Sequence, residues 1–125
     1  MARIMIVDDV ASIRSIVTSM LEKHGHRVFS VGSGDEAIQL AKAKRVHLVI
    51  TDVNMPGMDG LTLISQMKQI EHFKSTPIAV LAKGAKDENV DKAKAAGACD
   101  WIVKPFTEDS LNNKINQILV DYYVN

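Results

Sequence analysis

Short apolar runs alternate with longer amphipathic segments along this chain. The runs are three to five residues long and mostly rich in β-branched side chains. Nearly unbroken apolar runs of this length are typical of strands that are buried on both faces of a sheet. They predict five strands, over residues 4–7, 28–31, 46–50, 78–81 and 101–103.

The segments between these runs have helical periodicity. Apolar residues recur at spacings of three and four, which places them on one face of a helix. Helix boundaries are also marked, because Ser, Asp and Thr cap helix starts and Gly commonly follows a helix end. The first helical face carries Ile13, Val17, Met20 and Leu21. The predicted N-caps are Ser33, Asp59 and Thr107, and Glu36 completes a capping box with Ser33. The helix predicted over residues 86–96 stops at Gly97.

A strand followed by a helix, repeated five times, predicts an α/β fold. The expected architecture is a five-stranded parallel sheet, doubly wound, with helices on both faces and right-handed crossovers. The length of 125 residues fits a single domain over residues 1–125. In open sheets of this kind the working site lies at the carboxyl ends of the strands.

Charged residues stand where several of the predicted strands end. Asp8 and Asp9 follow the first strand, Asp52 follows the third, Lys83 comes just after the fourth and Lys104 follows the fifth. Three carboxylates close together repel one another unless a cation neutralises them, and hard oxygen ligands suit Mg²⁺. This set indicates a Mg²⁺-dependent phosphoryl site. Asp52 is the candidate nucleophile, and Lys104 would offset the charge of the phosphoryl oxygens.

Composition narrows the class of protein. Lys plus Arg and Asp plus Glu each number 15, so the basic excess typical of nucleic-acid binders is missing. No apolar run approaches the length of a membrane span, and acidic residues follow the N-terminus too closely for a signal peptide. Cys99 is the only cysteine, so no intrachain disulfide can form. These features predict a cytoplasmic protein without membrane insertion.

Four stretches resemble the receiver domain of two-component response regulators, especially the single-domain chemotaxis regulators of that family. The resemblance covers the domain from end to end, and its most specific part is the Asp-x-Asn-Met-Pro-Gly-Met-Asp-Gly pattern. The matching stretches are Asp8-Asp9, residues 51–60 (Thr-Asp-Val-Asn-Met-Pro-Gly-Met-Asp-Gly), residues 96–98 (Ala-Gly-Ala) and residues 104–107 (Lys-Pro-Phe-Thr).

The resemblance implies a flavodoxin-like fold and a role as a phosphorelay switch, which catalyses only its own phosphorylation and dephosphorylation. It implies that Asp52 accepts a phosphoryl group from a histidine kinase and that Lys104 pairs with that group. Its implied Mg²⁺ ligands are Asp8, Asp9, Asp52 and the backbone carbonyl of Asn54. It further implies that the backbone N–H groups of Val53 and Lys83 hold the phosphoryl group, and that the Lys104–Pro105 peptide bond is cis.

The same resemblance implies a signalling partner. The family's partner surface is formed by the fourth helix, the fifth strand and the fifth helix. With no output domain expected after Asn125, the signal would pass by protein contact. Analogy with the chemotaxis regulators suggests the flagellar motor switch as the target.

Two positions depart from the family pattern. Ala82 stands where the family usually has Thr or Ser, and Trp101 stands where it usually has Tyr or Phe. In the family, the hydroxyl moves to bond the phosphoryl group and the aromatic ring swings inward. A hydrogen bond to a charged group is worth roughly 1.5–3 kcal/mol, so its loss would remove a large share of the coupling. A pseudo-receiver that binds partners without phosphate control is therefore the alternative.

Two further classes of protein fit less well. A flavodoxin-like electron carrier would need a hydroxyl- and glycine-rich phosphate loop after the first strand, where Asp8 and Asp9 would repel a flavin phosphate. A stand-alone hydrolase with an Asp nucleophile would need an inserted segment to cap its substrate, and the short loops leave no room for one.

Overall fold

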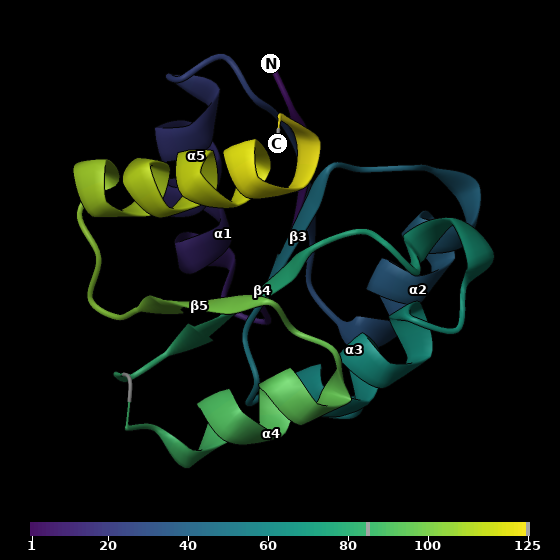
Figure 1. The fold of residues 1–125 in the computed structure, drawn as a ribbon. Coiled ribbons are helices and arrows are strands. Elements are labelled where there is room, and N and C mark those ends of the chain that lie inside the picture. Colours follow the sequence, from purple (N-terminus) through teal and green to yellow (C-terminus); the bar gives the residue numbers. More distant parts are fainter. Residues whose placement is uncertain (85, 125) are drawn as a thin grey trace.

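The chain folds into one parallel sheet covered by helices on both faces (Figure 1). The structure is a computed structural model that describes residues 1–84 and 86–124. The sheet has five strands in the order β2-β1-β3-β4-β5, and all neighbouring pairs are parallel. The predicted α/β class and doubly wound topology are confirmed.

The elements follow the predicted alternation. The strands are β1 (Arg3–Val7), β2 (Arg27–Val31), β3 (Leu48–Thr51), β4 (Ile78–Ala82) and β5 (Asp100–Val103). The helices are α1 (Ala11–Glu22), α2 (Gly34–Ala43), α3 (Gly60–Met67), α4 (Glu88–Ala96) and α5 (Glu108–Tyr123), with a short 3₁₀ helix over Glu71–Phe73.

Alternate residues of the central strands pack into two separate cores. In β1, Met5 and Val7 point into a core shared with α2, α3 and α4, whereas Ile4 and Ile6 point into a core shared with α1 and α5. Figure 1 shows α1 and α5 together on one side of the sheet. The period of two along a strand places successive side chains on opposite faces, so both faces of β1 are buried.

Burial on both faces was predicted for every strand, and this is wrong for β2 and β5. These two lie at the edges of the sheet, where Arg27 and Ser30 of β2 and Val103 of β5 are exposed. Strand order, which local patterns do not reveal, decides which apolar run becomes an edge. The third strand also begins later than predicted, at Leu48, because Val46 and His47 belong to the connection that precedes it.

Most predicted helix ends are confirmed. The side chains of Ser33, Asp59 and Thr107 each accept a backbone hydrogen bond from the first turn of α2, α3 and α5. Glu36 reaches the N–H of Gly32 instead of that of Ser33, so the predicted capping box is only half formed. The last helix carries a full capping box, formed by Thr107 with Ser110.

The helix predicted over residues 86–96 begins two residues later, at Glu88. Asp87 is its N-cap, and the Asp87 side chain accepts a hydrogen bond from the N–H of Asn89. The end is as predicted: Gly97 follows the helix with a φ of 123°, a conformation that favours glycine. None of the helices in the described residues is long and apolar enough to cross a membrane.

Two histidines accept backbone hydrogen bonds at the amino end of the sheet. The Nδ1 atom of His26 accepts from the N–H of Ala2 at 3.2 Å, and that of His47 accepts from the N–H of Arg3 at 2.9 Å. Burial lowers the pKa of both rings, assisted by the positive N-terminus at His26 and by Arg3 at His47. Both bonds require a neutral imidazole, because a protonated ring nitrogen cannot accept.

We therefore expect the free energy of unfolding to fall as pH is lowered from 7.5 to 5.5. Above the ordinary histidine pKa of about 6.5, the two rings are neutral in both the folded and the unfolded chain. Below it, the rings of the unfolded chain bind protons, whereas those of the folded chain, whose pKa is lowered, bind fewer. The loss is at most about 1 kcal/mol, because both rings are partly solvated. Urea unfolding at several pH values measures it. The double variant His26→Gln, His47→Gln should show a shallower dependence, and an equal slope in both proteins would contradict this origin.

Candidate functional site

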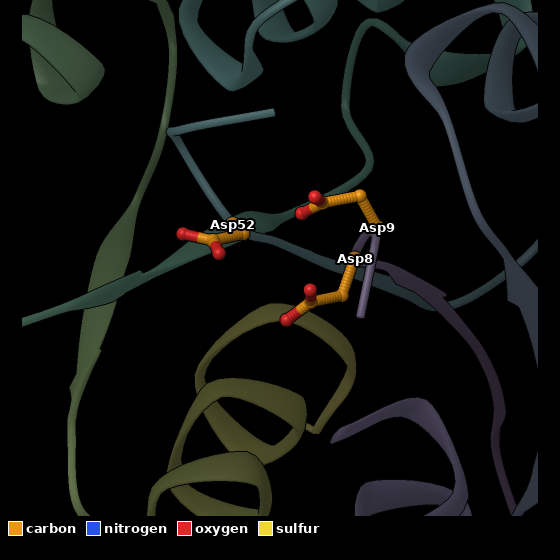
Figure 2. A group of neighbouring side chains, drawn as sticks. All are labelled: Asp8, Asp9 and Asp52. Atoms are coloured by element: carbon orange, nitrogen blue, oxygen red, sulfur yellow. The ribbon is translucent and has the colours of Figure 1, made fainter. Parts of the chain in front are cut away.

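Three carboxylates meet at the carboxyl edge of the sheet. Asp8 and Asp9 follow β1, and Asp52 follows β3, which lies beside β1. One carboxylate oxygen from each lies within 4.8 Å of the others, and Figure 2 shows the three side chains gathered around one point. The structure therefore brings together the three acidic residues that the sequence singled out.

Asp8 is the buried member of this cluster, with 1% of its surface exposed. Its Oδ1 accepts a hydrogen bond from the N–H of Val10 at 2.9 Å. Burial raises the pKa of Asp8 above its usual range, the Val10 hydrogen bond opposes this, and the nearby Asp52 carboxylate raises it further. A buried charge next to like charges is unfavourable, so this position favours a bound cation.

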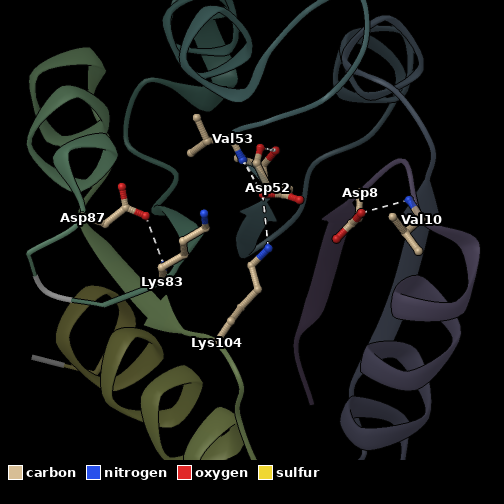
Figure 3. Close-up of polar contacts among 8 residues, drawn as sticks. Asp8, Val10, Asp52, Val53, Lys83, Asp87 and Lys104 are labelled. Atoms are coloured by element: carbon tan, nitrogen blue, oxygen red, sulfur yellow. Dashed lines mark hydrogen bonds and ion pairs between the residues drawn. The ribbon is translucent and has the colours of Figure 1, made fainter.

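Asp52 is partly exposed and has a basic partner (Figure 3). Its Oδ1 accepts a hydrogen bond from the N–H of Val53 at 2.8 Å and lies 3.5 Å from the Nζ of Lys104. The Lys104 side chain remains 39% exposed, so solvent screens this ion pair. The long, screened contact leaves the ammonium available to a larger anion attached to Asp52.

The turn after Asp52 depends on two glycines. Gly57 has a φ of 76°, which a side chain would strain. A Cβ on Gly60 would lie 2.2 Å from the carbonyl oxygen of Asp52, so only glycine lets the start of α3 pack against this residue. The N–H of Gly60 donates to the carbonyl of Val53 at 2.8 Å. This packing holds the backbone that carries Asp52.

Asn54 lies in the same turn, two residues after Asp52, and is exposed. Its backbone carbonyl as a metal ligand stays a prediction.

The ends of β4 and β5 form the other side of the site. Ala82 is buried at the end of β4, and its carbonyl accepts a hydrogen bond from the N–H of Lys104 at 2.7 Å. The Lys104–Pro105 peptide bond is cis, as the resemblance implied. The methyl group of Ala82 has no hydrogen-bonding atom, so the side chain at this position cannot contact a phosphoryl group by hydrogen bonding.

An apolar cavity that the sequence did not predict opens beside the carboxylates. It has a volume of about 550 Å³ and includes Asp8, Asp52, Lys83 and Lys104 in its wall. Its remaining lining is apolar and comes from α1, from the N-cap residue before it and from the segment after β5: Val10, Ile13, Ile16, Met20, Pro105 and Phe106. Helical periodicity placed Ile13 and Met20 on the inward face of α1 but did not show that the exposed Ile16 also borders this cavity.

A second feature missed from the sequence is the partner of the Lys83 N–H. The Oδ2 atom of Asp87 accepts this hydrogen bond at 3.1 Å (Figure 3). Asp87 is an ordinary N-cap residue, and that local signal was present in the sequence. Its second contact depends on how the loop after β4 turns back toward the strand.

Trp101 lies within β5, opposite Val80 of β4, and is half-buried. The Nζ of Lys94 lies 4.4 Å from the ring centroid, and the Nζ of Lys114 lies 5.5 Å from it. Cations over an aromatic face are attracted by the ring quadrupole. Lysines from both α4 and α5 therefore lie near this ring.

The donor set fits a hard divalent cation. Carboxylate oxygens are the ligands that Mg²⁺ prefers, and Mg²⁺ commonly keeps several waters in its shell. Asp8, Asp9 and Asp52 would supply protein ligands on one side, and their partly open position leaves room for water and for a phosphoryl oxygen.

Comparison with known proteins identifies the family. The sequence model of the response regulator receiver domain matches residues 4–116. The chain belongs to the response regulator receiver family. Its geometry agrees, since the family motifs after β1, β3 and β5 meet at one edge of the sheet.

Relatives of this receiver domain include single-domain proteins. It is 36% identical over 121 residues to the protein PilH of Pseudomonas aeruginosa, covering 95% of this chain and 98% of that one. It is 35% identical over 117 residues to the chemotaxis protein CheY-3 of Vibrio cholerae, covering 93% and 90% of the two chains.

Solved structures resemble this receiver domain closely. The Vibrio cholerae chemotaxis protein CheY4 superposes with a TM-score of 0.90 at 35% identity, over 94% of this chain and 98% of that one. The receiver domain of a Pseudomonas aeruginosa sensor histidine kinase has a TM-score of 0.85 at 24% identity, over 99% and 98% of the two chains. That structure holds a magnesium ion coordinated in its active-site cleft.

We expect Mg²⁺ to stabilise this receiver domain through the three carboxylates. At ten times its dissociation constant, a ligand that binds only the folded state adds about 1.4 kcal/mol, which corresponds to an increase in Tm of about 5 °C. Thermal unfolding with and without MgCl₂ measures this. Asp9→Asn should lose most of the increase, whereas Asp121→Asn, an exposed carboxylate on α5, should keep it. Equal increases in the two variants would contradict the assignment.

Proposed function

We propose that this receiver domain is a Mg²⁺-dependent phosphorelay switch that accepts a phosphoryl group on Asp52 from a histidine kinase. The observation that supports this proposal is the set of groups around the Asp52 carboxylate. A backbone N–H donates to its Oδ1 at 2.8 Å, the Lys104 ammonium lies 3.5 Å from the same atom, and two further carboxylates stand beside it.

The proposed reaction moves a phosphoryl group from nitrogen to oxygen. A carboxylate oxygen of Asp52 attacks the phosphorus of a phosphohistidine, the O–P bond forms, and the N–P bond breaks. The electron pair of that bond returns to the imidazole of the kinase. Lys104 then pairs with the phosphoryl oxygens, and the N–H groups of Val53 and Lys83 are the proposed backbone donors.

Magnesium would offset the charge of the phosphoryl oxygens when it is bound. Asp8 and Asp9 would hold it beside Asp52, with the Asn54 carbonyl as a further ligand. The buried position of Asp8 supports this assignment, because an uncompensated charge there is unfavourable. Beyond this self-modification, no reaction on a separate substrate is proposed.

The output is proposed to be a protein contact through α4, β5 and α5, in a single domain spanning residues 1–125. Exposed Val103 and half-buried Trp101 lie on this face, where Lys114 also borders a cavity of about 270 Å³. The names of the two Vibrio cholerae relatives support a chemotaxis role, with the flagellar motor switch as the candidate target. Such a role places the protein in the cytoplasm.

A pseudo-receiver remains the second candidate, and Ala82 favours it. The residue is buried at the end of β4 and has no hydroxyl to move toward a phosphoryl group. Trp101 is flanked by two lysines, which favours its present orientation. In this candidate function Asp52 still accepts the phosphoryl group, but the output face does not respond.

Asp52→Asn should abolish the mass increase that acetyl phosphate and Mg²⁺ produce in the wild type. The amide that replaces Asp52 is a poor nucleophile. Asp8 and Asp9 should not take over as acceptors, because the Lys104 ammonium pairs with Asp52 and not with them. Intact-mass spectrometry measures the modification, with Asp121→Asn as the control that should be labelled normally. Equal labelling of Asp52→Asn and wild type would show that Asp52 is not the acceptor.

Ala82→Thr should enlarge the response of the output face to phosphorylation. The new hydroxyl can donate to a phosphoryl oxygen, an interaction worth roughly 1.5–3 kcal/mol. Amide chemical shifts over α4 and α5 before and after phosphorylation measure the response. If the wild type shows no response and Ala82→Thr does, the pseudo-receiver is correct; if both respond equally, the hydroxyl is not what couples the site to that face.

A further inference from the structure

The Lys83 N–H, a proposed phosphoryl donor, already has an anionic acceptor in this protein. Asp87 Oδ2 accepts its hydrogen bond at 3.1 Å, while Oδ1 of the same carboxylate accepts from the N–H of Asn89 at 3.0 Å. In Figure 3, Lys83 lies between Asp87 and the group formed by Asp52 and Lys104. Lys83 also belongs to the wall of the cavity that contains Asp52.

We propose that Asp87 is the residue that couples phosphorylation of Asp52 to α4: its carboxylate occupies the Lys83 N–H in the unmodified protein, and a phosphoryl oxygen displaces it. This inference rests on the proposed function, since it requires a phosphoryl group on Asp52. In this proposal, the Asp87 carboxylate couples the site to α4, because Ala82 has no hydroxyl that could do so.

Charge favours the exchange. A phosphoryl group carries about −1.5 to −2 at neutral pH, against −1 for a carboxylate, so it is the stronger acceptor for the same N–H. Hydrogen bonds from Asn89 and Lys83 lower the pKa of Asp87, so it stays ionised and would repel a neighbouring phosphoryl group. Asp87 is only half-buried, so its carboxylate has room to move outward.

The displacement would act directly on the start of α4. Asp87 is the N-cap of this helix, and its carbonyl accepts the N–H of Val90 at 3.0 Å. Its own N–H donates to the carbonyl of Gly84 at 3.1 Å, so its backbone and side chain tie the helix to the loop after β4. Movement of Asp87 therefore changes the first turn of α4, which carries the buried Val90.

Asp87→Ser separates the two contacts of this carboxylate. Serine remains a good N-cap, so α4 keeps its start, but the shorter side chain cannot also reach the Lys83 N–H. Asp91→Ser is the matched control, because Asp91 is an exposed carboxylate in the same helix. Circular dichroism and thermal unfolding establish that both variants are folded.

The first measurement needs no phosphoryl group. Amide hydrogen exchange at Lys83 should be about two- to fivefold faster in Asp87→Ser than in the wild type, as expected for an exposed hydrogen bond to a charged group. Asp91→Ser should leave it unchanged. Equal exchange in wild type and Asp87→Ser would overturn the inference, because the Lys83 N–H would then not depend on Asp87.

The second measurement uses acetyl phosphate with Mg²⁺ and follows intact mass and amide chemical shifts together. We expect Asp87→Ser to be labelled at least as fully as wild type. Phosphorylation should still change the amide chemical shift of Lys83 in this variant, but the change over residues 88–93 should fall by about half or more. An undiminished change there would overturn the inference. Absence of the mass increase in the wild type would instead overturn the proposed function, while the exchange result would still report the Lys83–Asp87 contact.

Discussion

Asp8 and Asp52 meet because β1 and β3 pair in parallel with Val7 opposite Thr51. The N–H of Asp52 donates to the carbonyl of Val7 at 3.0 Å, so the residues that follow both strands leave the sheet at the same level. This register concentrates three carboxylates at one point and buries one of them. The resulting repulsion makes this edge of the sheet suited to a cation, and Lys104, which follows β5, lies 3.5 Å from Asp52.

The two-layer arrangement of helices determines what surrounds these carboxylates. The turn between β3 and α3 packs against Asp52 because Gly60 has no side chain to prevent the close approach. On the other face, α1 and the segment after β5 place apolar side chains beside the same carboxylates. The acidic centre therefore has an apolar border on one side and stays partly open to solvent at Asp9 and Asp52.

Position 82 shows that phosphorylation at this site could be coupled to α4 in two chemically different ways. A hydroxyl would gain a hydrogen bond when the phosphoryl group arrives, whereas the Asp87 carboxylate would lose one. Both mechanisms use the loop between β4 and α4, and both act on α4. In this chain the first is unavailable, since the buried Ala82 side chain is a methyl group. The second uses charge repulsion, which extends further than a single hydrogen bond and weakens with salt.

The sequence by itself determined the five strand–helix units, the helix ends at Ser33, Asp59, Gly97 and Thr107, and the carboxylates at the strand ends. These features depend on neighbours within a few residues, and such patterns are directly visible along a chain. Tertiary structure decided that β2 and β5 are edges, that an apolar cavity borders Asp52, that two lysines lie near the Trp101 ring, and that Asp87 accepts from Lys83. Each of these follows from which segments pack side by side and how a loop turns between them, because burial and hydrogen-bond partners depend on distances in space that spacing along the chain does not set.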